Sequence, residues 1–265
     1  MLTNTCASHA PAHRNGAMDV AALERLIVAL DQDNRDDSRK LVKQLGDSVL
    51  FYKVGWVSLL HGGVTLVEDL LRSGKRVFLD LKIFDVPNTV REAITRVANL
   101  GVRFATVHGN RENIEAALAG RQAAIDAGAR SDLKILAVTV LTSLNENDVR
   151  QLYSLPAHIS LQEHALNVAR RLIESGGDGV IASPWEVERI REEFPDRVLI
   201  VAPGIRVAGE SSHDHKRSGP PYESIKAGAD YIVVGRSIYQ NPDPKGQAER
   251  YVAEIERGLR DRTTV

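Results

Sequence analysis

Cysteine is nearly absent from this sequence, and so are long apolar runs and a net charge of either sign. The one cysteine among 265 residues, Cys6, lies near the N-terminus and rules out both an intrachain disulfide and a thiolate metal site. No apolar run approaches the roughly 20 residues of a membrane-spanning helix. With 34 basic and 35 acidic residues, the chain has no electrostatic bias toward nucleic acid or an anionic membrane. We therefore expect a soluble, cytoplasmic protein whose partner is a small molecule.

The chain is expected to fold as one domain. Residues 1–19 contain no apolar block of the length that a signal peptide needs, and we interpret them as a disordered extension. Residues 20–265 contain no linker rich in proline, glycine or serine that would divide them. About 250 residues in a single unit are typical of an α/β barrel.

Short apolar runs rich in β-branched residues alternate with longer amphipathic stretches along the whole domain. Val90–Leu100 and Arg111–Ala127 have the composition or spacing of helices. Strands separated by helices imply parallel crossovers, and eight such units close into a ring, so the predicted fold class is α/β, a (β/α)8 TIM barrel. The expected strands are Leu26–Leu30, Val49–Val54, Arg76–Leu81, Phe104–Val107, Lys134–Val140, Gly179–Ala182, Val198–Val201 and Tyr231–Val234.

Polar side chains follow the expected strands at the end where such barrels carry their active sites. A single aspartate after a strand could equally be a helix cap, and His108 has no second ligand at metal-binding spacing, so we expect it to support the rim and expect no metal. Polar positions at all eight strand ends together indicate a functional rim. These positions include Asp31, Lys53, Asp80, Lys82, His108, Thr142, Ser143, Ser183, Arg206 and Arg236.

The third expected strand ends with an acid and a base two residues apart, Asp80 and Lys82. Alternation along a strand places both side chains on one side, facing the barrel interior or its mouth. Asp85 and Lys53 add a second carboxylate and a second ammonium nearby. A salt bridge that fills the top layer of the barrel is the structural alternative to a catalytic group.

Two arginines beside glycines follow the last two expected strands. The loops after strands seven and eight of a barrel commonly bind phosphate. Gly235 permits close approach of backbone N–H groups, and Arg206 and Arg236 can each present a planar fork of donors to phosphate oxygens. Each arginine alone could be a solvated surface side chain, but the pair predicts a phosphate site.

The block Asp80-Leu81-Lys82-Ile83-Phe84-Asp85-Val86-Pro87-Asn88-Thr89 resembles the Asp-x-Lys-x-x-Asp-x-Pro-Asn-Thr signature of the orotidine 5'-phosphate decarboxylase family. The other matches follow in family order from about residue 25 to 240. They are Val28-Ala29-Leu30-Asp31, Lys53-Val54-Gly55, Thr139-Val140-Leu141-Thr142-Ser143, Pro203-Gly204-Ile205-Arg206 and Val233-Val234-Gly235-Arg236-Ser237.

The resemblance implies cofactor-free decarboxylation of orotidine 5'-phosphate to uridine 5'-phosphate in pyrimidine synthesis, by a homodimer with shared active sites. Asp31 and Lys53 would bind the ribose hydroxyls, Asp80 would face the substrate carboxylate, and Lys82 would protonate the carbon that loses carbon dioxide. The resemblance implies three further groups of site residues: Asp85 and Thr89 in the partner's site, Thr142 and Ser143 at the pyrimidine edge, and Arg206, Gly235 and Arg236 at the phosphate.

Two alternative functions stay open, and the sequence departs from the family pattern at one position. A related metal-dependent sugar-phosphate decarboxylase or epimerase would share the Asp-x-Lys-x-x-Asp element, and a non-catalytic nucleotide-binding barrel would share the fold. The long irregular segment Gly204–Pro221 is expected to close over the substrate. Within it, His215 stands where many bacterial members have glutamine, and we expect His215 to reach the phosphate.

Overall fold

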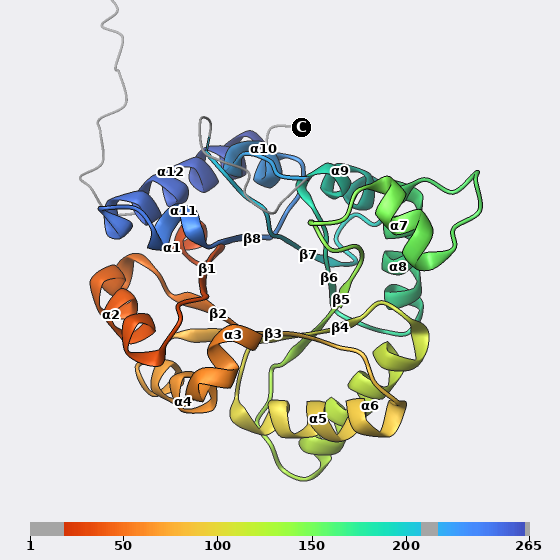
Figure 1. The fold of residues 1–265 in the computed structure, drawn as a ribbon, viewed down its shortest axis with the longest axis horizontal. Coiled ribbons are helices and arrows are strands. Elements are labelled where there is room, and N and C mark those ends of the chain that lie inside the picture. The colour runs from red at the N-terminus through yellow and green to blue at the C-terminus, as the bar shows by residue number, and fades with distance from the viewer. Residues whose placement is uncertain (1–18, 208–216, 263–265) are drawn as a thin grey trace, which may run out of the picture.

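The chain forms a closed barrel of eight parallel strands in sequence order, with helices around the outside (Figure 1). The computed structural model describes residues 19–207 and 217–262. The (β/α)8 barrel expected from the alternating pattern is confirmed. Its strands are β1 Leu26–Leu30, β2 Phe51–Gly55, β3 Arg76–Ile83, β4 Phe104–His108, β5 Lys134–Val138, β6 Gly179–Ile181, β7 Leu199–Ala202 and β8 Tyr231–Val234.

Helices follow the strands and cover their outer face. The two helices expected from the sequence are present as α5 and α6, each within three residues of the expected bounds. The helical elements are α1 Val20–Leu23, α2 Arg35–Leu45, η1 Gly46–Ser48, α3 Trp56–Ser58, η2 Leu59–Gly63, α4 Val64–Arg72, α5 Pro87–Leu100, α6 Arg111–Asp126, α7 Glu146–Tyr153, α8 Leu161–Glu174, α9 Pro184–Glu193, α10 Pro221–Lys226, α11 Arg236–Tyr239 and α12 Pro244–Arg262.

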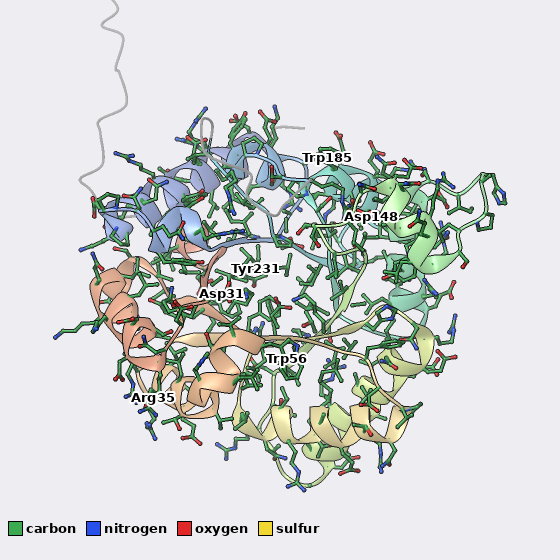
Figure 2. The ribbon with its side chains drawn as sticks, viewed as in Figure 1. Asp31, Arg35, Trp56, Asp148, Trp185 and Tyr231 are labelled. Carbon is green, nitrogen blue, oxygen red and sulfur yellow. The ribbon has the colours of Figure 1, made fainter. Side chains whose placement is uncertain are left out.

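The inside of the barrel is a packed apolar core with an aromatic centre. The Phe104 ring lies 5.0 Å from Phe51 and 5.0 Å from Tyr231, centroid to centroid. Figure 2 shows Tyr231 and Asp31 within the ring of strands, whereas Arg35 lies outside it. Because these rings fill the lower part of the barrel, any ligand must enter from the rim above them.

A second and larger apolar core lies between the strands and the helices. It is built from strand positions that alternate with the inward ones, such as Val28 and Leu30 on β1, and from the buried faces of the helices. The buried stripe of α5, which includes Val90, Ile94 and Val97, matches the spacing seen in the sequence. This packing fixes the strand ends that carry the polar rim.

Two aspartates hold the opposite, N-terminal ends of the strands. Asp178, directly before β6, pairs with Arg121 and Lys134 and accepts a hydrogen bond from the Ile135 backbone N–H at 2.9 Å. Asp230, directly before β8, pairs with Arg191 at 2.7 Å and accepts from the Ile200 N–H at 2.9 Å. Each carboxylate thus joins a strand to its neighbour and to a helix.

Some expected boundaries differ from the structure. Of the expected extension 1–19, only Asp19 belongs to the described residues, where its side chain caps α1 by accepting from the Ala21 N–H. β5 ends at Val138 rather than Val140, and β2 runs from Phe51 to Gly55 rather than from Val49 to Val54. None of the helices in the described ranges is long and apolar enough to cross a membrane.

Candidate active site

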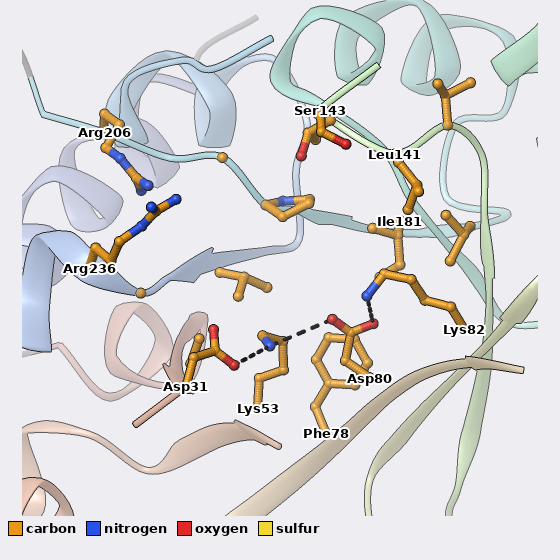
Figure 3. A pocket seen from close by; sticks show the side chains of 18 of the residues that line it. Asp31, Lys53, Phe78, Asp80, Lys82, Leu141, Ser143, Ile181, Arg206 and Arg236 are labelled. Carbon is orange, nitrogen blue, oxygen red and sulfur yellow. Dashed lines mark hydrogen bonds and ion pairs between the residues drawn. The ribbon is translucent and has the colours of Figure 1, made fainter. Parts of the chain in front are cut away.

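A pocket opens at the C-terminal ends of the strands, above the aromatic centre of the barrel (Figure 3). Its floor is apolar and its walls carry charged groups from several strand ends. Of the residues predicted for the site, those that line it are Asp31, Lys53, Asp80, Lys82, Thr142, Ser143, Arg206, Gly235 and Arg236.

Four charged groups form an alternating row along one wall of the pocket (Figure 3). Lys53 Nζ lies 3.2 Å from Asp31 Oδ1 and 3.6 Å from Asp80 Oδ2, and Lys82 Nζ lies 2.8 Å from Asp80 Oδ1. The inner pair is nearly buried, with 12% of the Lys53 and 13% of the Asp80 side chain exposed. The outer members are more open, at 37% for Asp31 and 39% for Lys82. The outer groups are therefore the ones a bound ligand can reach most directly.

Asp80 and Lys82 both reach the pocket from a part of β3 where its pairing with β4 is irregular. The pairing with β4 shifts register between Leu79 and Ile83, and Lys82 has a positive φ of 48°. A non-glycine residue with positive φ is uncommon and is held by its surroundings. Thr106 on β4 does so here, because its hydroxyl accepts from the Lys82 N–H at 2.9 Å and donates to Asp80 Oδ1 at 3.1 Å.

The row keeps its inner members charged. Burial alone would lower the pKa of Lys53, but the carboxylates of Asp80 and Asp31 outweigh it and raise the pKa. Burial alone would raise the pKa of Asp80, but Lys53, Lys82 and the Thr106 hydroxyl together lower it. The pocket therefore presents a charged Asp80 carboxylate and a charged Lys53 ammonium at neutral pH. Gly55 leaves room for this, since a Cβ there would lie 3.3 Å from Lys53 Nζ.

Two guanidinium groups face each other at the other end of the pocket (Figure 3). Arg206 follows β7 and is 7% exposed, and its Nη1 donates to the Ile205 carbonyl at 2.6 Å. Arg236 is the first residue of α11, after Gly235 at the end of β8. Two forks of donors at adjacent strand ends suit an anion such as a phosphate.

The loop after β5 forms the wall between these two ends. Thr142 and Ser143 line the pocket from this loop, together with Leu141. Beneath the loop, Val140 packs with Val149 and Leu161 in a small separate core. The loop that carries Thr142 and Ser143 is thus packed against a small apolar core.

Three predicted site residues are not among those lining the pocket. Asp85 is exposed on the segment after β3, where its Oδ1 accepts from the Val86 N–H at 2.7 Å, and Thr89 is exposed in the first turn of α5. Within the described part of the chain they lie outside the cavity of their own subunit. His215 lies outside the described residues. His108 lies beside Phe84, with 4.4 Å between the ring centroids, and its Nδ1 is 3.3 Å from Asn110 Oδ1.

Several residues of the site were not predicted. Thr106 could have been found, because it lies two residues after the inward-facing Phe104 on β4 and therefore faces the same side. Tyr239, which also lines the pocket, stands three residues after Arg236 on the same short helix and gave no separate signal. In residues 19–207 and 217–262, no three His, Cys, Asp or Glu side chains gather closely enough to hold a metal ion.

Comparison with known proteins gives a consistent result. The family model described as "Orotidine 5'-phosphate decarboxylase / HUMPS family" matches residues 24–251. A protein of Nitrobacter winogradskyi named orotidine 5'-phosphate decarboxylase is 44% identical over 239 residues, which cover 90% of this chain and 95% of that protein. A protein of Ruegeria pomeroyi with the same name is 43% identical over 235 residues, covering 88% and 94%.

Solved structures agree with these sequence matches. The crystal structure of orotidine 5'-phosphate decarboxylase from Lactobacillus acidophilus superposes with a TM-score of 0.76 at 37% identity, covering 88% of this chain and 99% of that one. An uncharacterized conserved protein from Geobacillus kaustophilus superposes with a TM-score of 0.73 at 31% identity, covering 87% and 99%.

Proposed function

The chain belongs to the orotidine 5'-phosphate decarboxylase / HUMPS family, and from that premise we infer that it converts orotidine 5'-phosphate to uridine 5'-phosphate in pyrimidine biosynthesis. The observation that carries this inference is the alternating row of Asp31, Lys53, Asp80 and Lys82 in a pocket whose far end holds Arg206 and Arg236. Such a pocket suits a ligand with a phosphate at one end and a reacting carboxylate at the other. We propose the cytoplasm as its compartment, because the sequence has one cysteine and no charge bias.

The phosphate lies between Arg206 and Arg236 in this proposal, with the Gly235 backbone nearby. The ribose hydroxyls meet Asp31 and Lys53, and the pyrimidine edge meets Thr142 and Ser143. This order places the substrate carboxylate beside Asp80 and its ring carbon near Lys82 Nζ. The carbon–carboxylate bond breaks, carbon dioxide leaves, and the electron pair left on the ring carbon takes a proton from Lys82.

Magnitudes indicate which group contributes most. Enzymes lower barriers by about 8–23 kcal/mol, and a carbanion without a delocalising cofactor belongs near the upper end. Repulsion between Asp80 and a substrate carboxylate at about 4 Å amounts to about 4 kcal/mol at an effective dielectric constant near 20. Most of the acceleration must therefore come from the Lys82 ammonium, which stabilises the developing negative charge, assisted by binding energy from the remote phosphate.

A homodimer with shared sites is part of the proposal. Exposed apolar side chains lie on α3–α4, among them Trp56, and on the segment after β3, among them Phe84. The Trp56 indole donates a hydrogen bond to the Leu81 carbonyl at 2.8 Å, which joins the two segments. Exposed apolar patches mark contact surfaces. Asp85 follows Phe84 directly and Thr89 lies in the first turn of α5, so we propose that a second copy bound to this patch receives both residues in its own pocket.

The test of the function is an ultraviolet assay of orotidine 5'-phosphate turnover by the purified protein, with and without a chelator. We expect turnover that is unchanged by the chelator. Loss of turnover on chelation would contradict a cofactor-free reaction. Absence of turnover in both arms would contradict the proposed function and leave the metal-dependent sugar-phosphate chemistry or a non-catalytic barrel.

The shared site is tested by subunit exchange between two inactive variants. Mixing Asp85→Ala with Lys82→Ala chains creates heterodimers with one intact and one doubly altered site. Activity should reappear on exchange. If confirmed heterodimers stay inactive, Asp85 does not act in the partner's site.

A further inference from the structure

Arg217 is a buried cation just outside the pocket, with 3% of its side chain exposed. Its Nη1 pairs with the Glu186 carboxylate of α9 and donates to the Ser183 hydroxyl at 3.1 Å. The acid is itself fixed, because it also accepts from the backbone N–H and the hydroxyl of Ser183, each at 2.7 Å, in the capping box of α9. Arg217 is thereby anchored to the N-terminus of a helix behind β6.

The remaining donors of Arg217 reach the loop after β5. Its Nη2 donates to the carbonyls of Val140 at 3.2 Å and Leu141 at 2.9 Å, and its Nε donates to the carbonyl of Leu144 at 3.1 Å. These carbonyls stand on both sides of Thr142 and Ser143, the two polar residues of the loop that line the pocket. One side chain therefore fixes the backbone that carries both.

This arrangement needs the shape of an arginine. A guanidinium offers five N–H donors in a rigid plane, whereas a lysine ammonium offers three donors on a flexible stem. Burial lowers the pKa of Arg217 to about 10, which leaves the side chain charged at neutral pH beside Glu186. Replacement by lysine would keep the charge but could not reach Glu186 and the carbonyls on both sides of the turn together.

The backbone around Arg217 joins the same turn to the phosphate end of the pocket. The Trp185 indole donates to the Ser218 carbonyl at 3.1 Å, and the Arg206 N–H donates to the Gly219 carbonyl at 3.0 Å. The pairing of Ile205 with Gly219 does not use the Arg217 side chain. A change at Arg217 should therefore loosen the turn after β5 while leaving the Arg206 backbone in place.

We propose that Arg217 is a positioning residue for base recognition, which holds Leu141–Leu144 so that Thr142 and Ser143 meet the pyrimidine ring. The inference rests on the proposed function, in which those two residues contact the base. It predicts that Arg217 acts on the affinity for the base and leaves the affinity for the sugar phosphate unchanged.

The experiment compares two competitive inhibitors of orotidine 5'-phosphate turnover that differ by the base: uridine 5'-phosphate and ribose 5-phosphate. Arg217→Lys should raise the inhibition constant of uridine 5'-phosphate about ten-fold, as expected for the loss of one or two hydrogen bonds, and raise KM in parallel with a smaller change in kcat. The inhibition constant of ribose 5-phosphate should change less than about two-fold.

Arg191→Lys is the matched control. Arg191 is also largely buried, donating to the Gly228 carbonyl from Nε at 3.2 Å and from Nη2 at 3.0 Å and pairing with Asp230, but it lies at the opposite end of the barrel. The substitution Arg191→Lys should lower the thermal midpoint and leave both inhibition constants unchanged. Glu186→Gln, which weakens the anchor of Arg217, should raise the uridine 5'-phosphate constant in the same direction and serves if Arg217→Lys does not fold.

Equal weakening of both inhibitors in Arg217→Lys, or an unchanged constant for uridine 5'-phosphate in a folded variant, would overturn the inference. In either result the wild-type protein still turns over orotidine 5'-phosphate, so the proposed function would stand. If the wild-type protein shows no turnover, the proposed function fails first, and with it the premise of this inference.

Discussion

The two ends of the barrel both carry clusters of acidic and basic side chains, yet the clusters are built differently. At the N-terminal end, Asp178 and Asp230 each accept from a backbone N–H of the neighbouring strand as well as from arginine side chains. At the C-terminal end, the Asp80 carboxylate contacts three side chains, those of Lys53, Lys82 and Thr106. A carboxylate that ties backbone to helix holds the fold together, whereas one that meets only side chains beside a cavity can act on a ligand.

The comparison favours one of the two interpretations of Asp80 and Lys82 left open by the sequence. A salt bridge that only fills the top layer of the barrel would be closed over by neighbouring side chains. Instead, 39% of Lys82 is exposed in the wall of a pocket, and its backbone is held at positive φ. We therefore propose that the C-terminal cluster serves chemistry and the N-terminal cluster serves stability.

The largest effect should come from Lys82→Ala at the C-terminal end. Removing the proton donor and the main stabilising charge should lower kcat by at least about 10⁴-fold, since general-acid and electrostatic contributions are each worth about 10² or more. The thermal midpoint should change little. Steady-state kinetics and a melting curve on the same preparation check this, and near-normal turnover would refute the proposed role of Lys82.

The next largest effect should come from Asp178→Ala at the N-terminal end. The substitution leaves Arg121 and Lys134 without their carboxylate in a site where 13% of the Asp178 side chain is exposed. The free energy of unfolding should fall by about 3 kcal/mol. Denaturant unfolding measures it, and kcat should stay within about three-fold of the parent value.

A surface pair provides the control for Asp178. Asp132 pairs with Arg103 but is 70% exposed, so Asp132→Ala should change the free energy of unfolding by no more than about 1 kcal/mol. If Asp178→Ala and Asp132→Ala lower the free energy of unfolding by the same amount, the cluster at the N-terminal end is not the structural support that we infer.

A smaller effect is expected from Asp31→Asn at the outer end of the charged row. The amide keeps the shape of the side chain but loses the charge that faces Lys53, so KM should rise about ten-fold while kcat changes less. Asp36→Asn on α2, at an aspartate that is 74% exposed, is the control and should leave both constants unchanged. A fall in kcat with unchanged KM would move Asp31 from binding to catalysis.

The smallest expected effect is that of pH, because the charges of Asp80 and Lys53 should stay constant across the neutral range. The lowered pKa of Asp80 means that its favourable interactions are present above its unfolded value of about 3.9 and are lost only as the pH falls through the still lower folded value. The raised pKa of Lys53 means that its contribution is present below about 10.4 and is lost only above that pH. Neither group should titrate between about pH 5 and 9.

Carbon-13 NMR of carboxyl-labelled aspartate can follow Asp80 directly, with its resonance assigned by Asp80→Asn. A flat chemical shift from pH 5 to 9 is the expected result. A titration of the Asp80 carboxyl within that range would show that the two lysines do not hold it charged.

The sequence predicted the fold well because its signals were local and repeated. Runs such as Leu26–Leu30 and Tyr231–Val234 matched β1 and β8 to the residue, since β-branched apolar segments between helices have few other structures to adopt. The nine predicted residues found in the pocket lie in the later parts of strands or in the segments that follow them, which the barrel brings to one rim.

What the sequence could not predict depends on contacts between distant segments. Strand alternation predicted that Asp80 and Lys82 share one side, but it did not predict the register shift in β3 or the contacts of both residues with Thr106 of the next strand. Arg217 gave no signal, because a charged residue in a polar loop is ordinarily solvated and its burial depends on Glu186, 31 residues away. The role proposed for Asp85 and Thr89 requires a second subunit, and the structure of one chain does not contain that contact.

The most direct test of the difference between the two ends is a matched pair of isosteric changes, Asp80→Asn and Asp230→Asn, measured for both turnover of orotidine 5'-phosphate and thermal midpoint. The account predicts that Asp80→Asn lowers kcat/KM by at least about 10³-fold with a small shift in midpoint, whereas Asp230→Asn lowers the midpoint by several degrees and keeps kcat/KM within about three-fold. Equal losses of turnover in the two variants, or a larger loss of stability from Asp80→Asn, would contradict it.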